Sequence, residues 1–177
     1  NQYNNHWNQS KPGGREVCVH AFIGKLADGS IATHQTLPWN HRGWHAGGAA
    51  NNTHIGFEIC EDGLTDASYF SAVYKEAVEL CVHLCKLYGF SEKDIICHSE
   101  GYKRGIASNH GDVMHWFPKH GKSMDTFRAD VKKLLITENK PAEPVKKKYY
   151  RVQIGAYSDK ANAEAQLAKA KKAGFTD

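Results

Sequence analysis

The segment from Asp66 to Gly89 constrains the fold most, because it has the pattern of one long helix with both ends marked. Asp66 is a residue type that caps the N-termini of helices, and Gly89 is the type that most often ends them. Between them the apolar residues recur at helical spacing, at Phe70, Val73, Ala77, Leu80, Cys81, Leu84 and Leu87. The sequence therefore predicts a helix over residues 66–88.

The residues before this helix have the pattern of strands. Residues 16–23 and 30–37 are predicted to form a hairpin, because Asp28-Gly29 between them is a strong turn signal. Residues 38–52 are rich in Trp, His and Gly and are expected to form a loop. Residues 53–60 are then predicted to return to the sheet.

Two more elements are predicted after the long helix. Residues 94–97 read as a short strand that ends at His98, where open sheets flanked by helices tend to build their clefts. Residues 123–135 read as an amphipathic helix. The fold class expected for this part of the chain is α/β, a mixed central sheet flanked by helices.

A second, smaller unit is predicted near the C-terminus. Residues 137–148 contain two prolines and almost nothing to bury, which is typical of a linker. Residues 149–157 read as a strand and 158–173 as an Ala-rich helix closed by Gly174. We expect three parts: a domain over 1–136, the linker, and a partial βα unit over 149–177.

Charge and cysteine content narrow the class of protein. The chain has 177 residues, and its net charge of +4 lies entirely in residues 138–177, which carry 9 Lys and Arg against 5 Asp and Glu. This basic tail could attract nucleic acid or another polyanion, but a solvated linker has the same composition, and we favour the linker. Five cysteines form an odd set without framework spacing, which favours synthesis in a reducing cytosol. We find neither a signal peptide nor an apolar run long enough to cross a membrane.

The segment Cys97 to Asp112 holds three side chains that can bind a metal or transfer protons, namely His98, His110 and Asp112. Imidazole nitrogen and carboxylate oxygen are ligands that Zn²⁺ takes, and catalytic zinc keeps three protein ligands and an open position for water. The first hypothesis from these residues is a zinc hydrolase. Glu58 stands in an apolar, strand-like run, so its side chain is predicted to point away from the core and could face a cleft.

Four blocks of sequence, in this order, resemble a known family. They are Val19 to Ile23 followed by Asp28-Gly29-Ser30, then Gly43-Trp44-His45-Ala46-Gly47, then Ile55-Gly56-Phe57-Glu58, then His98 to Asp112. Residues 1–135 resemble the zinc-dependent N-acetylmuramoyl-L-alanine amidases of the peptidoglycan-recognition (type 2 amidase) fold, and most closely the bacteriolytic endolysins of phages that infect clostridia. Residues 149–177 resemble the first half of a SPOR domain, a small module that binds the glycan strands of peptidoglycan. A structural βα unit without a ligand is the alternative for this part.

The resemblance implies a zinc site. His98 and Asp112 match two metal ligands of the family. The third ligand of the family is a His on a strand ahead of the hairpin, so we expect it upstream of Asn1. His20 is a minor candidate for this role, because it belongs to the strand that walls the site.

The resemblance also implies catalytic and substrate-binding residues. Glu58 matches the general base of the family. His110 stands where many members carry a Lys that stabilises the oxyanion, a role that a protonated imidazole can fill only near or below its pKa. Trp44 and His45 are expected to line the substrate groove. His115 and Trp116 either help to close the site or pack in the core.

The function implied is hydrolysis of the amide between N-acetylmuramic acid and L-alanine in the bacterial cell wall, by water that zinc activates. The alternative is a recognition module that binds peptidoglycan without cleaving it, since this fold also occurs in that role. The expected partners are the muramoyl peptide and the glycan strands. We expect a monomer, without bound nucleic acid or membrane insertion, that is made in the cytoplasm and acts on the wall.

Overall fold

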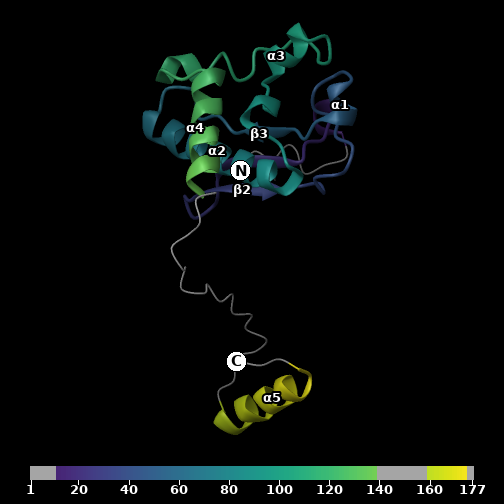
Figure 1. The fold of residues 1–177 in the computed structure, drawn as a ribbon, viewed down its shortest axis with the longest axis vertical. Helices are drawn as coiled ribbons and strands as arrows, with labels where there is room; N and C mark the ends of the chain where they lie inside the picture. Colours follow the sequence, from purple (N-terminus) through teal and green to yellow (C-terminus); the bar gives the residue numbers. More distant parts are fainter. Residues whose placement is uncertain (1–10, 139–158, 175–177) are drawn as a thin grey trace. The chain divides into compact units, whose positions relative to one another are not determined.

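The computed structural model describes residues 11–138 and 159–174 of the chain (Figure 1). The chain divides into two compact units, residues 1–141 and residues 142–177. The strand expected over 149–157, and the linker expected over 137–148 apart from its first two residues, lie outside the described residues.

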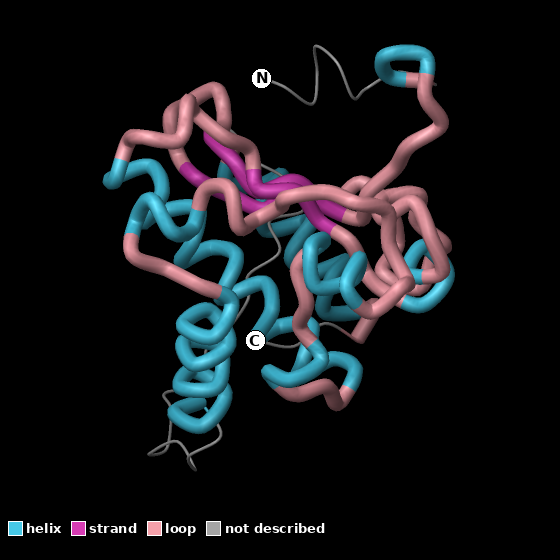
Figure 2. Tube along the Cα trace, turned by 90° about the horizontal axis from the view of Figure 1, so that it is seen from above, coloured by secondary structure: helices cyan, strands magenta, loops and turns pink. Residues whose placement is uncertain are grey.

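A three-stranded mixed sheet lies in the first unit, where Figure 2 draws its strands in magenta. The strand order is β2-β1-β3. Strands β1 (Ala21–Lys25) and β2 (Ile31–Gln35) form the predicted antiparallel hairpin. Strand β3 (Phe57–Ile59) pairs with β1 in parallel. The hairpin turn is closed because the Asp28 carboxylate accepts hydrogen bonds from both the backbone N–H and the hydroxyl of Ser30.

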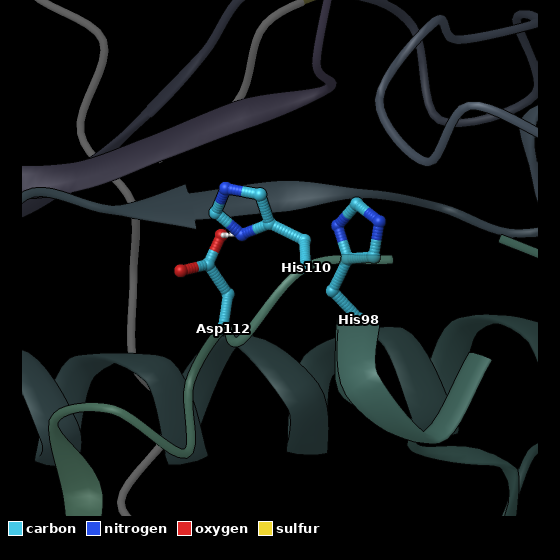
Figure 3. Close-up of side chains that lie close together, drawn as sticks. All are labelled: His98, His110 and Asp112. Atoms are coloured by element: carbon cyan, nitrogen blue, oxygen red, sulfur yellow. Dashed lines mark ion pairs between the residues drawn. The ribbon is translucent and has the colours of Figure 1, made fainter. Parts of the chain in front are cut away.

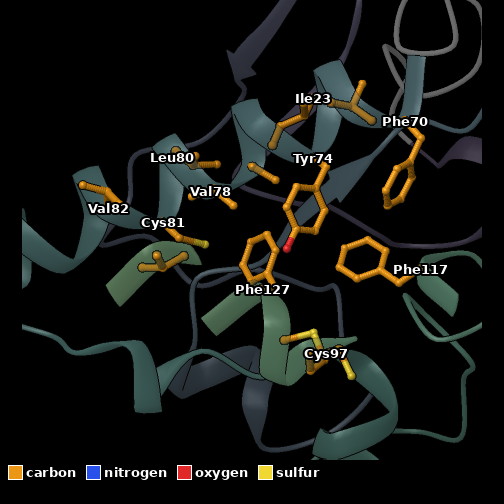
Figure 4. Close-up of a cluster of buried hydrophobic side chains, with 14 of the residues drawn as sticks. Ile23, Phe70, Tyr74, Val78, Leu80, Cys81, Val82, Cys97, Phe117 and Phe127 are labelled. Carbon is orange, nitrogen blue, oxygen red and sulfur yellow. The ribbon is translucent and has the colours of Figure 1, made fainter. Parts of the chain in front are cut away.

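The long helix α2 (Ala67–Tyr88) confirms the prediction from residues 66–89. The Asp66 carboxylate accepts hydrogen bonds from the backbone N–H of Ser68 and of Tyr69, and Gly89 ends the helix with a φ of 72°. The buried face of α2 packs against β1, β2 and the helix α4 (Met124–Glu138), which matches the second amphipathic helix predicted from the sequence. The core to which α2 and α4 contribute combines aliphatic and aromatic side chains (Figure 4), and its aromatic members include Phe70, Tyr74, Phe117 and Phe127.

The prediction of a short strand at residues 94–97 is wrong. Residues 92–94 form a 3₁₀ helix (Glu92–Asp94), and residues 95–97 have no strand partner among the described residues. The backbone groups of this segment bond to side chains and to the adjacent helical turns instead of to a neighbouring strand: the Ile95 N–H donates to the Glu92 carbonyl at 3.4 Å, and the Cys97 carbonyl accepts from the Gly101 N–H at 3.0 Å. The Ile95 carbonyl accepts from Arg128 at 3.1 Å, and the Cys97 N–H donates to Glu100 at 3.3 Å.

The remaining elements of this unit are short. Helix α1 (Ala50–Thr53) occupies the end of the predicted loop and the first residue of the strand predicted over 53–60, so that strand is shorter than predicted and covers only Phe57–Ile59. Helix α3 (His98–Lys103) begins at the residue where a strand was expected to end. Two more 3₁₀ helices cover Pro12–Gly14 and Phe117–His120. The result is a mixed α/β fold, as the sequence predicts.

The second unit contains helix α5 (Lys160–Lys172), which confirms the Ala-rich helix predicted over 158–173. The Asp159 carboxylate caps its N-terminus by accepting from the backbone N–H of Ala161 and Asn162, and Gly174 follows its end with a φ of 91°. Within the described ranges, no helix combines the length and the apolarity that a membrane crossing requires.

Candidate functional site

Three side chains of the predicted site come together in the structure: His98, His110 and Asp112 (Figure 3). Their ligand atoms all lie within 4.8 Å of one another. His110 Nδ1 is 2.7 Å from Asp112 Oδ2, and the rings of His98 and His110 are 5.3 Å apart. His98 is the first residue of α3, and the other two come from the loop that follows this helix.

The position of His98 depends on the way α3 begins. Glu100 accepts a hydrogen bond from the backbone N–H of Cys97 at 3.3 Å, which ties down the residue directly before His98. The Glu100 carboxylate is itself held by both terminal nitrogens of Arg128 on α4, at 2.9 and 3.0 Å. A bidentate ion pair of this kind fixes orientation as well as distance. The ion pair between Glu100 and Arg128 therefore anchors the start of α3 to α4.

Ser108 links the same helix to the Gly-rich loop. Its hydroxyl lies 3.2 Å from His98 Nε2 and donates to the carbonyl of Ala46, also at 3.2 Å. The Ser108 N–H bonds to the same carbonyl at 2.8 Å. Burial, and secondarily the nearby His110, lower the pKa of His98 below its ordinary value. A neutral imidazole is the form that binds a metal.

Glu58 faces the cluster from the sheet. It lies on β3 opposite Phe22, while its neighbours Phe57 and Ile59 pack against the core, so the side chains alternate as the sequence predicts. It lines a cavity of about 630 Å³ together with His98, Asp112 and His115. Burial raises the pKa of Glu58 to about 7, with further contributions from the negative charges of Asp112 and Glu61.

His20 lies elsewhere and does not join the cluster. Its side chain is fully buried, with Nε2 2.9 Å from the carbonyl of His41 and Nδ1 3.0 Å from the backbone N–H of Gly56. Nδ1 also lies 3.2 Å from the carbonyl of Gly56. Both ring nitrogens are engaged by the backbone, which suits a structural role in this wall of the site.

The two residues predicted to bind substrate lie in the Gly-rich loop but differ in position. His45 is half-buried and lines the cavity with Glu58, and burial is the main cause that lowers its pKa. Trp44 is 44% exposed and does not line this cavity. The Arg42 guanidinium lies 4.6 Å from the centre of the Trp44 ring, a cation–π contact on the surface.

Sequence reasoning missed a second group of close side chains, formed by Glu61, Asp112 and His115. His115 Nδ1 is 3.3 Å from Asp112 Oδ1, and His115 Nε2 is 2.5 Å from Glu61 Oε1. The sequence placed His115 near Asp112 and left open whether it closes the site or packs in the core. No local pattern singles out Glu61, because its contact with His115 joins residues 54 positions apart. Trp116, in contrast, is buried in the core.

The donor set of the first cluster fits zinc. Two imidazole nitrogens and one carboxylate oxygen are ligands that Zn²⁺ takes, and three protein donors leave a position for water or substrate, as in catalytic sites. Glu58 adds a carboxylate with a pKa near neutrality in the same cavity. Such an arrangement suits metal-assisted hydrolysis.

Comparisons with known proteins identify the family of the first unit and a similar fold. The family described as N-acetylmuramoyl-L-alanine amidase matches residues 1–115, and the SPOR domain matches residues 146–177. The fold is similar to the crystal structure of the Staphylococcus aureus hydrolase AmiA in complex with its ligand, with a TM-score of 0.59 and 19% sequence identity. That match covers 77% of this chain and 63% of the AmiA chain. No curated protein matches the chain.

Proposed function

Because the chain belongs to the N-acetylmuramoyl-L-alanine amidase family, we propose that it is a peptidoglycan hydrolase that cleaves the amide between N-acetylmuramic acid and L-alanine. The observation that carries this proposal is the convergence of Glu58 with His98 and Asp112 on one cavity. A binding module would not need a carboxylate with a pKa of about 7 beside a group of metal donors.

The metal would be held by His98, His110 and Asp112. Zinc bound there would polarise the scissile carbonyl and make a water molecule acidic enough to lose a proton near neutral pH. The lowered pKa of His98 supports its role as a donor, because it keeps the imidazole neutral.

Glu58 would act as the general base. A base works best when its pKa lies near the operating pH, and burial brings Glu58 there. It would take a proton from the attacking water and later return one to the leaving amine of L-alanine. His45 lines the same cavity and would orient the substrate, whereas Trp44 would contact glycan or peptide at the surface.

We assign the third donor position to His110, because its Nδ1 lies 2.7 Å from Asp112 Oδ2 and within reach of His98. The oxyanion role remains the other hypothesis for this residue. The two assignments separate in a His110→Ala variant. If His110 is a metal donor, the variant loses metal affinity. If His110 stabilises the oxyanion, the variant binds the metal as the wild type does and only kcat falls.

The second unit would retain the enzyme on its substrate. The SPOR match over 146–177 supports binding of glycan strands by this part of the chain. We keep the predicted division into a catalytic domain over 1–136, a linker over 137–148 and a partial SPOR-like unit over 149–177 as part of the proposal.

The deciding experiment measures metal content and wall hydrolysis on one sample. We expect one zinc ion per chain, and new N-terminal L-alanine released from purified walls without new reducing sugar ends. Glu58→Gln should keep the zinc and lose the release. A wild-type chain that holds zinc and binds walls but produces no new N-terminal L-alanine would be a recognition module instead. New reducing ends would point to a glycosidase.

A further inference from the structure

His115 has a carboxylate oxygen beside each of its ring nitrogens, and the two carboxylates come from distant parts of the chain. Nδ1 faces Asp112 Oδ1 at 3.3 Å, and Nε2 faces Glu61 Oε1 at 2.5 Å. The other oxygen of Asp112, Oδ2, faces His110 at 2.7 Å. The two oxygens of Asp112 are thus divided between two imidazoles, one inside the donor cluster and one outside it.

Glu61 and His115 stand on two separately anchored segments. Glu61 follows Cys60, whose N–H donates to the carbonyl of Ile23 on β1 at 2.8 Å and whose carbonyl accepts from the Tyr69 hydroxyl at 2.7 Å. The backbone N–H of His115 bonds to the carbonyl of Gly111 at 3.2 Å, which closes the turn that contains Asp112. A contact between Glu61 and His115 therefore joins the end of β3 to this turn.

We propose that Glu61 and His115 form a positioning pair that holds Asp112 Oδ1, so that Oδ2 faces the donor cluster at a fixed distance from Glu58. This inference rests on the proposed function. It assigns to both residues a role through Asp112, without contact with the bond that is cleaved. Carboxylate ligands of metals are commonly held by such partners, and losing a partner typically costs 10- to 100-fold in metal affinity or activity.

The competing explanation is an ordinary surface ion pair, since the side chains of Glu61 and His115 are 42% and 36% exposed. Such a pair adds little to stability and has no reason to affect metal binding. Metal affinity therefore separates the two explanations, and it does so without an activity assay.

The test uses the full chain and zinc alone, with the dissociation constant measured by competition against a chromogenic chelator. Glu61→Ala and His115→Ala are each expected to raise the Kd by about 10- to 100-fold. The double variant should be no weaker than the weaker single variant, because the two residues act as one unit. Glu61→Gln, which keeps a carbonyl acceptor for His115, should recover most of the affinity and also serves if the Ala variant fails to fold.

A matched control is Glu79→Ala, which removes an exposed ion pair with Lys75 on α2. Its Kd should stay within about twofold of the wild type. The Co²⁺ absorption spectrum gives a second readout. It should keep its shape in the Glu61 variants, since a positioning residue does not change the set of ligands.

Three outcomes would overturn the positioning role of Glu61 and His115, and they differ in what they imply for the proposed function. If Asp112→Ala abolishes zinc binding while the Kd of the Glu61 and His115 variants stays at the wild-type value, the pair has no positioning role and the proposed function stands. If the wild type binds two ions and Glu61→Ala loses one, the group Glu61, Asp112 and His115 is itself a metal site, and the inference is overturned. If Asp112→Ala binds zinc as tightly as the wild type, the proposed donor set is wrong and the role of the pair fails with it.

Discussion

The carboxylate of Glu58 should make the metal-free protein less stable above neutral pH, and replacing it with a neutral side chain should remove this effect. The pKa of Glu58 rises from its ordinary value of 4.5 to about 7, mainly through burial. Between these two values the folded protein holds a proton that the unfolded chain has lost. The stability that this proton provides is complete below pH 4.5 and is lost as the pH rises through 7.

The magnitude follows from the size of the rise. At about 1.36 kcal/mol per pH unit, it corresponds to about 3 kcal/mol. Glu58→Gln has nearly the same shape but no charge to lose. We therefore expect this variant to be about 3 kcal/mol more stable than the wild type at pH 8.5, and about equally stable at pH 4.5.

The assay is urea unfolding of both proteins at the two pH values, in the presence of a chelator that removes metal. Tryptophan fluorescence suits it, because all four tryptophans lie in residues 1–141 and report on the first unit alone. Glu79→Gln, on the exposed face of α2, controls for the loss of a surface charge and should show little difference at either pH. If the stability of Glu58→Gln relative to the wild type were the same at pH 4.5 and 8.5, burial of the charge would not be the cause, and the reasoning would fail.

Three further predictions concern other parts of the fold. Arg128→Ala leaves Glu100 half-buried and without its ion-pair partner, so we expect the free energy of unfolding in urea to fall by about 2 kcal/mol and zinc binding to weaken. An unchanged zinc Kd would mean that the ion pair between Glu100 and Arg128 does not position His98. Asp66→Ala removes the N-cap of α2 and should lower the free energy of unfolding in urea by about 1 kcal/mol. A decrease below a few tenths of a kcal/mol would show that the cap is dispensable. In Gly56→Ala the added Cβ would overlap the ring of His45, so hydrolysis of purified walls should slow while zinc content stays constant; an unaltered rate of hydrolysis would remove His45 from the substrate site.

The sequence predicted most of the fold where the signals are local. Helix α2 could be predicted because Asp66 and Gly89 mark both ends of a periodic run, and the hairpin because Asp28-Gly29 occupies its turn. The strand at 94–97 was wrong because an apolar run does not show whether a neighbour exists to complete the ladder. Here the Ile95 carbonyl and the Cys97 N–H are instead satisfied by the side chains of Arg128 and Glu100, from positions that the run itself does not indicate.

In the candidate site, too, the residues with a local sequence signal could be predicted and those that depend on tertiary contacts could not. His98 and Asp112 could be named in advance because they share one short segment with a recognisable pattern, and Glu58 because it interrupts an apolar strand. Their chemical roles are still predictions. The contact of Glu61 with His115 could not be predicted, since it forms only when the end of β3 meets the turn after α3, and it depends on tertiary packing alone.

The closeness of the three candidate donors along the chain has a consequence for the order of events during folding. His98, His110 and Asp112 lie within residues 98–112, so bringing them together closes only a short loop, at a small entropic cost. The unfolded chain should therefore keep some affinity for zinc, which reduces the stabilisation that the ion gives to the folded state. Glu58 reaches the site only after β3 has paired with β1. We expect a newly made chain to capture its metal before it can use it, so that loading with zinc and competence for hydrolysis arise at separate times.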